Sequence, residues 1–579
     1  MIYLFKLLSY LKNYTRHMVI SMLFLIMSVI FTMIQPKLIE WVIDQGIGAG
    51  VAKNIIYGAA GILITGLIGN AANLFSGFSL IKAGQGLSHE IRGDLFRKIV
   101  SFSFINFDKW RTGELMVRLN SDVNTVRMFI RMGLFMIVQS VVTIFSSILF
   151  MFITDVRLAT IMSIIMGGTL VLSLVFVSIM RPLFMKMRVK LDELNNTLQE
   201  NLAGAKVVRA FNRQVLEKDK FSVKNRDIFL ITLKIGYLFA TFMPFMLFLG
   251  NMSVTLILWI GGAEIIRNHL AAASGFTLGQ LTAFNNYAMM SIFPLVMLGM
   301  VLNFISMASA SAERIFKLMQ ELPGIDTPDA PFPADNIRGG IEFNGVSFGY
   351  GEGEDALIDI NIRIAPGEKV GIIGGTGSGK SSLAGLIPRL YDPRHGEILI
   401  DGVDVKKYDP SELRKKIGIV LQDPVLFSGG IMENILYGRP DGDQVVAERA
   451  AGIAQAISFI SEKGWDTGIG ERGAGLSGGQ RQRVAIARTI AADPKIIILD
   501  DVTSSLDLDT ERKVTRGIYD ELKGATVIII SQKIKTIKES DWIIVMDKGR
   551  ITGKGTHEEL LVSNDIYRKI AETQNEYIQ

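Results

Sequence analysis

Long stretches without Asp, Glu, Lys or Arg dominate the chain up to Ala312. A bilayer core of roughly 30 Å is crossed by about 20 residues of helix, and only helices or closed barrels satisfy the backbone there. The pattern therefore predicts six membrane-spanning helices rather than the buried core helices of a large soluble protein. The charge-free windows are Met18–Pro36, Asn54–Ile81, Met132–Thr154, Leu158–Met180, Ile235–Ala263 and Asn268–Ala312.

The connections between these windows alternate between long, basic segments and short, nearly uncharged ones. Twelve Lys and Arg residues lie between Arg181 and Lys234, and the second-to-third connection is also rich in them. Because Lys and Arg are retained on the cytoplasmic side, we expect both termini and the two long connections in the cytoplasm, with the chain in the cell membrane. Apolar residues recur at a helical period from Leu191 to Ala205, so the spans should continue beyond the bilayer.

The sixth window carries amide side chains among aromatic ones, and Pro244 and Pro294 interrupt the fifth and sixth windows. Two interpretations of the amides stay open: they line a pocket for a largely apolar solute, or they form hydrogen bonds between helices. Ionisable residues lie only near the ends of the spans, which argues against proton or ion coupling. The amides are Gln280, Asn285, Asn286 and Asn303.

Composition agrees with a partly membrane-embedded chain. Apolar residues make up 49% and charged residues 20% of the 579 residues. The net charge of +5 is too small to indicate nucleic acid as a partner, and the absence of Cys excludes disulfides and thiolate metal sites. The expected partners are a lipid bilayer and a hydrophobic small-molecule solute, whose identity the Met- and Phe-rich helices do not specify.

The pattern changes after the sixth window. A segment rich in Pro and Asp reads as an extended linker at 321–340, and from Ile341 short apolar strands alternate with helical segments, which predicts a mostly parallel α/β sheet. We therefore expect a membrane all-α domain of six long transmembrane helices at 1–320 and an α/β nucleotide-binding domain at 341–579. The predicted strands are Lys369–Ile373, Ile417–Leu421, Ile496–Leu499, Val527–Ile530 and Trp542–Met546.

A Gly-rich loop with the pattern G-x-x-x-x-G-K-S follows the first of these strands and precedes a helix predicted at Ser382–Leu390. Glycines let successive N–H groups converge on phosphates, Lys380 reaches the outer phosphate oxygens, and the Ser381 hydroxyl can bind Mg²⁺. The pattern predicts an ATP site of the P-loop type. Its residues are Gly374, Gly375, Thr376, Gly377, Ser378, Gly379, Lys380 and Ser381.

The strand Ile496–Leu499 ends in Asp500 and Asp501. A carboxylate at the end of a buried strand beside a phosphate-binding loop can hold Mg²⁺, and this is the role we assign to Asp500. A second segment with the features of an anion site precedes this strand. It reads Leu476, Ser477, Gly478, Gly479, Gln480, with Arg481 following.

This second segment resembles the signature sequence of the ATP-binding cassette (ABC) family, and the whole chain resembles an exporter-type half-transporter. The resemblance implies that Tyr350 stacks on adenine. It implies that Gln422 contacts Mg²⁺ and couples to the membrane part, and that 504–507 reaches across a cassette dimer. It also places the coupling segments, which transmit motion to the membrane helices, at Asn106–Glu114 and Val207–Asn212.

A second anion site is redundant beside the first unless it faces the ATP of another chain. The residues themselves thus favour a dimer of two half-transporters with ATP bound between Gly374–Ser381 of one chain and Ser477–Gln480 of the other. ATP would then hold the two cassettes together, and its hydrolysis would let them part.

Two positions depart from the pattern of the family. Where the family has a catalytic glutamate the chain has Asp501, and where it has a switch histidine the chain has Gln532. A carboxylate withdrawn by one methylene is a poorer general base, and glutamine takes up no proton. The chain thus resembles the degenerate-site subunit of bacterial heterodimeric multidrug exporters, which implies a non-identical partner with Glu and His.

The expected function is ATP-driven export of hydrophobic or amphipathic solutes, with slow hydrolysis at this chain's own ATP site. The alternatives are a homodimeric lipid or peptide exporter and a membrane regulator that uses ATP binding as a switch and moves no solute. The expected catalytic residues are Asp501, Gln532 and Gln422, and the expected Mg²⁺ ligands are Ser381, Gln422 and Asp500.

Overall fold

The computed structural model describes residues 2–270, 275–502 and 506–574, with the chain divided into two compact units. Unit 1 is Met1–Val100 with Thr112–Glu321, and unit 2 is Ser101–Arg111 with Leu322–Gln579. The domain boundaries at 320 and 340 stay a prediction. The short segment Ser101–Arg111 belongs to unit 2 although it lies between two helices of unit 1.

Unit 1 is helical. Within the described residues six helical stretches are long and apolar enough to cross a membrane, which confirms the six predicted spans. Its elements are α1 (Ile2–Leu8), η1 (Ser9–Tyr14), α2 (Thr15–Val42), η2 (Ile43–Ile47), α3 (Ala52–Val100), α5 (Thr112–Val117), η3 (Arg118–Asp122), α6 (Val123–Met128), η4 (Phe129–Leu134), α7 (Phe135–Thr154), α8 (Val156–Ala203), α9 (Ala205–Ala210), α10 (Gln214–Leu270) and α11 (Leu278–Gln320).

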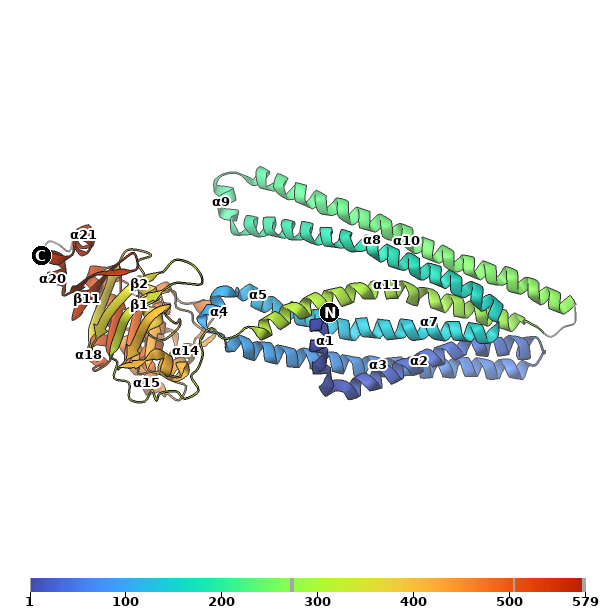
Figure 1. Cartoon of the computed structure of the whole chain (residues 1–579), viewed down its shortest axis with the longest axis horizontal. Helices are drawn as coiled ribbons and strands as arrows, with labels where there is room; N and C mark the ends of the chain where they lie inside the picture. The colour runs from blue at the N-terminus through green and yellow to red at the C-terminus, as the bar shows by residue number, and fades with distance from the viewer. Residues whose placement is uncertain (1, 271–274, 503–505, 575–579) are drawn as a thin grey trace. The chain divides into compact units, whose positions relative to one another are not determined.

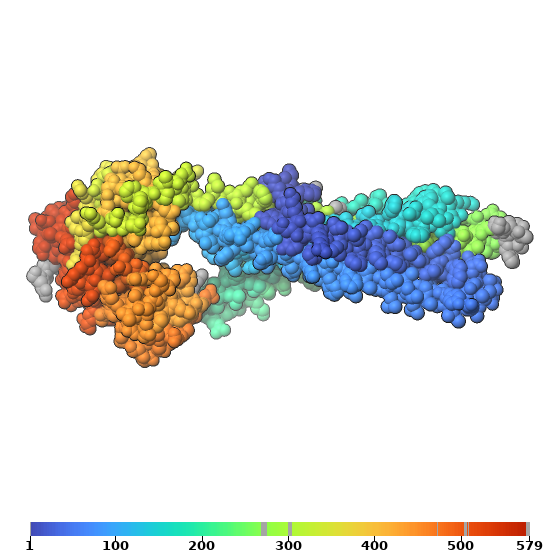
Figure 2. Space-filling model, turned by 90° about the horizontal axis from the view of Figure 1, so that it is seen from below, coloured from blue at the N-terminus to red at the C-terminus, as the bar shows by residue number. Residues whose placement is uncertain are grey.

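Several of these helices are much longer than a bilayer requires. α8 has 48 residues and α10 has 57, so α8 is about 72 Å long at 1.5 Å per residue. α8 and α10 lie side by side and are joined at one end by α9, and this end stands apart from α3 and α11 (Figure 1). α2 and α3 pack against each other along the unit (Figures 1 and 2).

Two predicted helix limits are wrong. The sixth window begins at Asn268, but α11 begins at Leu278, where Thr277 and Gln280 form a reciprocal capping box. A charge-free window identifies apolar sequence and not a helix, so its first residue need not be the first residue of the helix. The helix predicted at Ser382–Leu390 is α12 (Lys380–Leu386), which starts inside the phosphate-binding pattern.

Unit 2 contains a six-stranded sheet in the order β12-β11-β3-β10-β9-β6, a four-stranded sheet in the order β2-β1-β4-β5 and a short pair, β7-β8. Its strands are β1 (Ile341–Phe348), β2 (Leu357–Ile364), β3 (Lys369–Gly374), β4 (His395–Ile400), β5 (Val403–Asp404), β6 (Ile417–Val420), β7 (Gly429–Gly430), β8 (Gly468–Ile469), β9 (Ile496–Asp500), β10 (Thr526–Ile530), β11 (Trp542–Asp547) and β12 (Arg550–Gly555).

Helices cover these sheets and complete an α/β domain, as predicted. The strands β11, β3, β10, β9 and β6 are mutually parallel, and their residues are almost entirely buried. The helices of unit 2 are α4 (Phe104–Lys109), α12, η5 (Val405–Lys407), α13 (Pro410–Lys415), α14 (Ile431–Ile435), η6 (Leu436–Gly438), α15 (Gln444–Ile453), α16 (Ile457–Lys463), η7 (Glu471–Gly473), α17 (Gly478–Ala491), α18 (Leu508–Glu521), α19 (Ile534–Ile537), α20 (His557–Ser563) and α21 (Asp565–Thr573).

Candidate functional site

Four predicted site segments follow neighbouring strands of the parallel sheet. Gly374 ends β3, Gln532 lies just beyond β10, Asp500 ends β9, and Gln422 lies just beyond β6. The carboxyl ends of parallel strands meet at one edge of a sheet, where α/β folds bind their ligands. Four segments that are distant in sequence therefore gather at one edge.

The loop Gly374–Ser381 turns from β3 into α12. Gly379 has φ +98°, and a Cβ there would lie 2.7 Å from the Ala356 carbonyl oxygen. Only glycine combines this backbone conformation with such a close approach. The turn brings the N-terminus of α12 and the loop N–H groups to the edge of the sheet, which is an arrangement that binds phosphate.

Lys380 opens α12 and its side chain folds back over the loop. Its Nζ donates to the carbonyl oxygens of Gly374 at 3.0 Å and Gly375 at 2.7 Å, and to the hydroxyl of Ser378 at 3.3 Å. Burial lowers the pKa of Lys380, against the opposing effect of the Asp500 and Asp501 carboxylates. An ammonium that is buried on loop carbonyls can exchange these contacts for phosphate oxygens at little cost in desolvation.

Ser381 and Asp500 face each other across the loop. Burial raises the pKa of Asp500, and a hydrogen bond from the Ser381 side chain lowers it. A hydroxyl and a carboxylate oxygen are hard ligands that suit Mg²⁺, and phosphate oxygens and water can complete its shell. The described residues hold no cluster of three or more His, Cys, Asp or Glu suited to a metal. The donors thus fit a Mg²⁺ that is bound together with a nucleotide.

Asp501 and Gln532 lie next to each other beyond β9 and β10. Asp501 has a left-handed backbone with φ +49°, and its N–H donates to the Ile530 carbonyl oxygen at 2.9 Å. Gln532 Nε2 lies 3.5 Å from Asp501 Oδ2, which is the outer limit of a hydrogen bond. Burial, and next the charge of Asp500, raises the pKa of Asp501. The two departures from the family pattern are therefore neighbours in space.

Tyr350 and Gln422 expose their side chains. Tyr350 is 47% exposed, and its hydroxyl lies 3.0 Å from that of Ser382 on α12, so part of the residue is open to a base. Gln422 is exposed and lies two residues beyond Val420, which pairs with Leu499 near the end of β9. The fold brings Gln422 to the correct edge, but no hydrogen bond among the described residues joins it to Ser381 or Asp500.

An aromatic residue that sequence reasoning missed connects this site to α4. The Tyr391 ring meets those of Tyr350 at 5.3 Å and Phe104 at 6.1 Å, and its hydroxyl donates to Asp108 Oδ2 at 2.9 Å. Burial and the Asp108 carboxylate both raise the pKa of Tyr391. Asp108 of the predicted coupling segment Asn106–Glu114 is thus linked through Tyr391 to Tyr350, the predicted base-stacking residue.

The other end of α4 is fastened to the chain that follows α11. Asn106 is buried, and its Nδ2 donates to the Leu322 carbonyl oxygen at 2.8 Å. The Gly324 N–H donates to Asn106 Oδ1 at 3.0 Å and to Ser103 Oγ at 3.1 Å. These bonds account for the grouping of Ser101–Arg111 with unit 2.

The segment Leu476–Gln480 begins α17. Ser477 is the N-cap: its Oγ accepts from the Gln480 N–H at 3.3 Å, and its own N–H donates to Gln480 Oε1 at 2.9 Å. Ser477 and Gly478 are exposed. Within 2–270, 275–502 and 506–574, no hydrogen bond or ion pair joins this segment to the loop Gly374–Ser381, so the two anion sites of one chain do not meet.

Among the described side chains of unit 1, no hydrogen bond joins an amide of the sixth span to another helix. Gln280 caps its own helix and Asn286 Nδ2 donates to Thr282 one turn away, whereas Oδ1 of buried Asn285 lacks a hydrogen-bond partner among the described residues. The side chain of Asn303 lies outside the described part. One hydrogen bond between helices comes from Tyr287, whose buried hydroxyl donates to the Met33 carbonyl oxygen at 3.0 Å.

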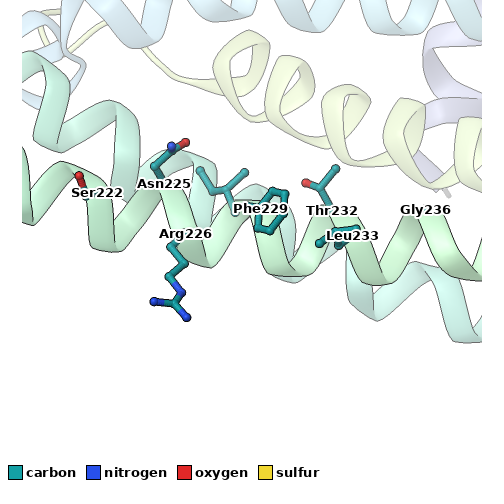
Figure 3. A pocket seen from close by; sticks show the side chains of 8 residues that line it. Ser222, Asn225, Arg226, Phe229, Thr232, Leu233 and Gly236 are labelled. Carbon is teal, nitrogen blue, oxygen red and sulfur yellow. The ribbon is translucent and has the colours of Figure 1, made fainter.

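A groove of about 710 Å³ runs along α10 in unit 1, and its lining includes none of the predicted nucleotide-site residues. Its lining is mixed, and Arg226 points to the opposite side of the helix from Asn225 and Thr232 (Figure 3). The lining residues are Ser222, Asn225, Arg226, Ile228, Phe229, Thr232, Leu233 and Gly236.

Both units contain segments that match families of known proteins. Residues 18–295 match the ABC transporter transmembrane region, and residues 357–504 match the ABC transporter family proper. The uncharacterized ABC transporter ATP-binding protein YknU of Bacillus subtilis (strain 168) is 32% identical over 98% of this chain and 97% of its own length. The chain belongs to the ABC transporter family. YfiB of the same organism is 34% identical to this ABC transporter over 98% of each chain.

A solved structure shares the whole architecture of this ABC transporter. A bacterial Atm1-family ABC exporter with ATP bound is 27% identical and superposes with a TM-score of 0.80, over 96% of this chain and 99% of that one. The ATP-dependent lipid A-core flippase of Desulfotalea psychrophila (strain LSv54 / DSM 12343) is 34% identical over 83% of each chain. The chain is thus a multi-pass, ATP-hydrolysing half-transporter of the exporter type, and ABC exporters work as dimers.

Proposed function

We propose that this ABC transporter is one half of a heterodimeric exporter of hydrophobic or amphipathic solutes, and that its own ATP site hydrolyses slowly. The observation that carries the proposal is the pair Asp501 and Gln532, at the positions where the family has the catalytic base and the switch residue. Asp501 Oδ2 and Gln532 Nε2 lie 3.5 Å apart. Both residues that differ from the family pattern occupy positions that take part in hydrolysis. The residues that bind phosphate keep the pattern of the family.

The remaining site residues support binding of ATP. In the proposed site Lys380 holds the outer phosphates, Ser381, Gln422 and Asp500 hold Mg²⁺, which would neutralise phosphate charge, and the exposed Tyr350 ring stacks on adenine. The backbone N–H groups of Gly374–Gly379 contact the phosphates. Each of these interactions is present in the ground state, so together they favour retention of ATP over its cleavage.

Hydrolysis needs a group that accepts a proton from water. Asp501 is one methylene shorter than glutamate, and a general base outside hydrogen-bond reach of its water costs on the order of a hundredfold in rate. Gln532 carries no charge and donates only through its amide. Asp501 and Gln532 would therefore position and activate the attacking water poorly. A partner with Glu and His would provide the competent site.

The exposed start of α17 supports the composite arrangement. Ser477 and Gly478 are exposed, and among the described residues the segment Ser477–Gln480 makes no hydrogen bond to its own phosphate-binding loop. They would complete the partner's ATP site, and the partner's segment would complete this one. Closure of both sites would turn the membrane helices outward, and hydrolysis would reopen them inward.

The positions of the parts in the cell belong to the same proposal. The basic connections between spans support a cytoplasmic location for both termini and the ATPase domain, with the chain in the cell membrane. The domains are proposed at 1–320 and 341–579 with the linker between them, and the coupling segments at Asn106–Glu114 and Val207–Asn212. Exposed Val207 and Phe211, at 60% and 74%, suit contact with a partner.

A homodimeric lipid exporter is the second candidate, because a relative at 34% identity is an ATP-dependent lipid A-core flippase. One experiment separates the two. The tagged chain is purified from its own cells, the second subunit is identified by mass spectrometry, and each subunit is photolabelled with radioactive azido-ATP to follow hydrolysis. We expect a different second subunit with Glu and His, and slower loss of the γ-phosphate on this chain. A single subunit with equal rates supports the homodimer.

A further inference from the structure

The switch residue Gln532 is bracketed by the side chain of Gln574, which follows the last turn of α21. Gln574 Nε2 donates to the Gln532 carbonyl oxygen at 2.7 Å, and Gln574 Oε1 accepts from the Ile534 N–H at 2.9 Å. The Gln574 carboxamide thus forms hydrogen bonds to the backbone on both sides of Lys533. This is the pairing that a neighbouring β-strand would supply, made here by a side chain 42 residues further along the chain.

The local structure gives this contact a specific task. Ile534 is the first residue of the four-residue helix α19, and its N-cap Lys533 makes no side-chain cap bond. The first N–H groups of a helix lack partners within the helix. Gln574 supplies one such partner and, with the same amide, fixes the direction of the carbonyl group of the switch residue.

The base of this contact is rigid. Tyr567 and Ala571 of α21 are fully buried in the same hydrophobic core as Ile534 and Ile537 of α19. The other side of the loop is held by α18. Buried Glu511 of this helix accepts a hydrogen bond from Thr536 and forms an ion pair with Lys533 at 3.3 Å. The segment from Ser531 to Ile534 is therefore held from two helices, and Gln532 within it is exposed.

We infer that Gln574 is a positioning residue for ATP hydrolysis, which acts by holding Gln532 against the γ-phosphate side of the site. The inference rests on the proposed role of Gln532. A histidine at this position could be attracted to phosphate by its charge, whereas a neutral glutamine cannot. Its placement therefore depends on the loop backbone, and Gln574 is one side chain that fixes this backbone next to the switch residue.

The chemistry of the contact restricts which residues can make it. A donor and an acceptor are needed at once, and the carboxamide offers both in one plane. Gln574→Met keeps the length and removes both bonds. Gln574→Glu keeps the acceptor for Ile534 and replaces the donor with an oxygen that repels the Gln532 carbonyl. The ordering of a long side chain offsets much of the gain from two hydrogen bonds, so the contact affects position more than stability.

The test measures a single turnover of ATP on this chain, photolabelled with azido-ATP in the purified dimer with its native partner. We expect Gln574→Met to slow loss of the γ-phosphate on the order of tenfold, since small misplacements are costly in rate, and to leave ATP affinity within about twofold. Gln574→Glu should behave in the same way. Glu572→Gln makes the reverse exchange two residues earlier on an exposed position and should match the unmodified chain.

A second background separates positioning from a general structural role. In Gln532→Ala no side chain is left to be held, so adding Gln574→Met should slow hydrolysis no further, whereas a structural defect would add its full effect. Equal losses in both backgrounds, or Gln574→Met turning over like the unmodified chain, would overturn the inference alone. If Gln532→Ala itself has no effect, the proposed role of Gln532 and the inference fail together.

Discussion

The hydroxyl of Tyr391 donates a 2.9 Å hydrogen bond to the carboxylate of Asp108 on α4. The ring of the same tyrosine packs edge-on against Tyr350, the proposed adenine-stacking residue, at 5.3 Å. A single side chain therefore touches both the nucleotide side of unit 2 and the predicted coupling segment. Tyr391 therefore connects the proposed adenine-stacking residue to α4.

The first prediction concerns this hydrogen bond. Tyr391→Phe keeps the ring and its packing but removes the hydroxyl that holds Asp108. We expect ATP affinity within about twofold of the unmodified chain, because no nucleotide contact changes, and a clear fall in solute transported per ATP hydrolysed. Both quantities are measured in proteoliposomes that contain the dimer.

Tyr519→Phe is the matched control, since it removes a hydroxyl that contacts Ser540 at 3.2 Å, away from α4. If Tyr391→Phe transports as efficiently as this control, the coupling role assigned to Tyr391 and Asp108 is wrong.

The second prediction concerns Lys380. Lys380→Met removes the charge that pairs with the outer phosphates, a contact worth about 1.5 to 3 kcal/mol, so ATP affinity at this chain's site should fall about tenfold to a hundredfold. Photolabelling of this chain with azido-ATP over a range of concentrations measures the effect. Lys523→Ala, on an exposed turn, should bind as before; unchanged affinity in Lys380→Met would remove the residue from its role.

The third prediction follows from the raised pKa of Asp501. A carboxyl whose pKa is higher in the folded than in the unfolded chain destabilises the fold once it is ionised, so stability increases as pH falls through the folded pKa. Asp501→Asn removes this cost at pH 7 and suits the left-handed backbone at φ +49°. Without nucleotide we expect its thermal midpoint to rise by at most about 3 °C, since partial exposure screens the charge.

The gain from Asp501→Asn should shrink as pH falls toward about 4, the ordinary pKa of an aspartate, because both chains are then neutral at this position. Asp329→Asn, in the exposed linker, serves as the control and should leave the midpoint unchanged. If Asp501→Asn raised the thermal midpoint equally at every pH, the gain would come from the backbone conformation alone and not from the lost charge.

Sequence alone predicted the features that are written in neighbouring residues. Apolar windows predict spans because the bilayer requires a continuous stretch, and the loop from Gly374 to Ser381 is local in the chain. The start of α11 was missed although Thr277 and Gln280 form a capping box that the sequence displays. The gathering of four site segments at one edge depends on the strand order β3-β10-β9-β6, which the sequence did not predict.

The rest depends on contacts with no local signal. Tyr391 and Asp108 are 283 residues apart, and Gln574 and Gln532 are 42 apart. Nothing in the stretch from Ser101 to Arg111 shows that Asn106 will bind the chain after α11 and so group this segment with unit 2. Such pairs arise from tertiary packing, which a single sequence does not display.

The last prediction tests the asymmetry of the two ATP sites in the dimer. Ser477 would face the γ-phosphate in the partner's competent site, so Ser477→Ala should lower steady-state ATP turnover strongly, by about tenfold or more for a lost phosphate contact in the transition state. Asp501→Asn affects a site that already turns over slowly and should change total turnover by less than about twofold. Both variants are compared in the same purified dimer.

Ser477 also caps α17, so a loss of stability could imitate a loss of catalysis. Thr556→Ala removes an equivalent capping box from α20 and should cost a similar amount, about 1 kcal/mol, without lowering turnover. The pair Asp501→Glu with Gln532→His should raise hydrolysis on this chain, because the proton acceptor and the charged switch residue return together. Equal losses from Ser477→Ala and Asp501→Asn would instead indicate two equivalent sites, which is the behaviour of a homodimer.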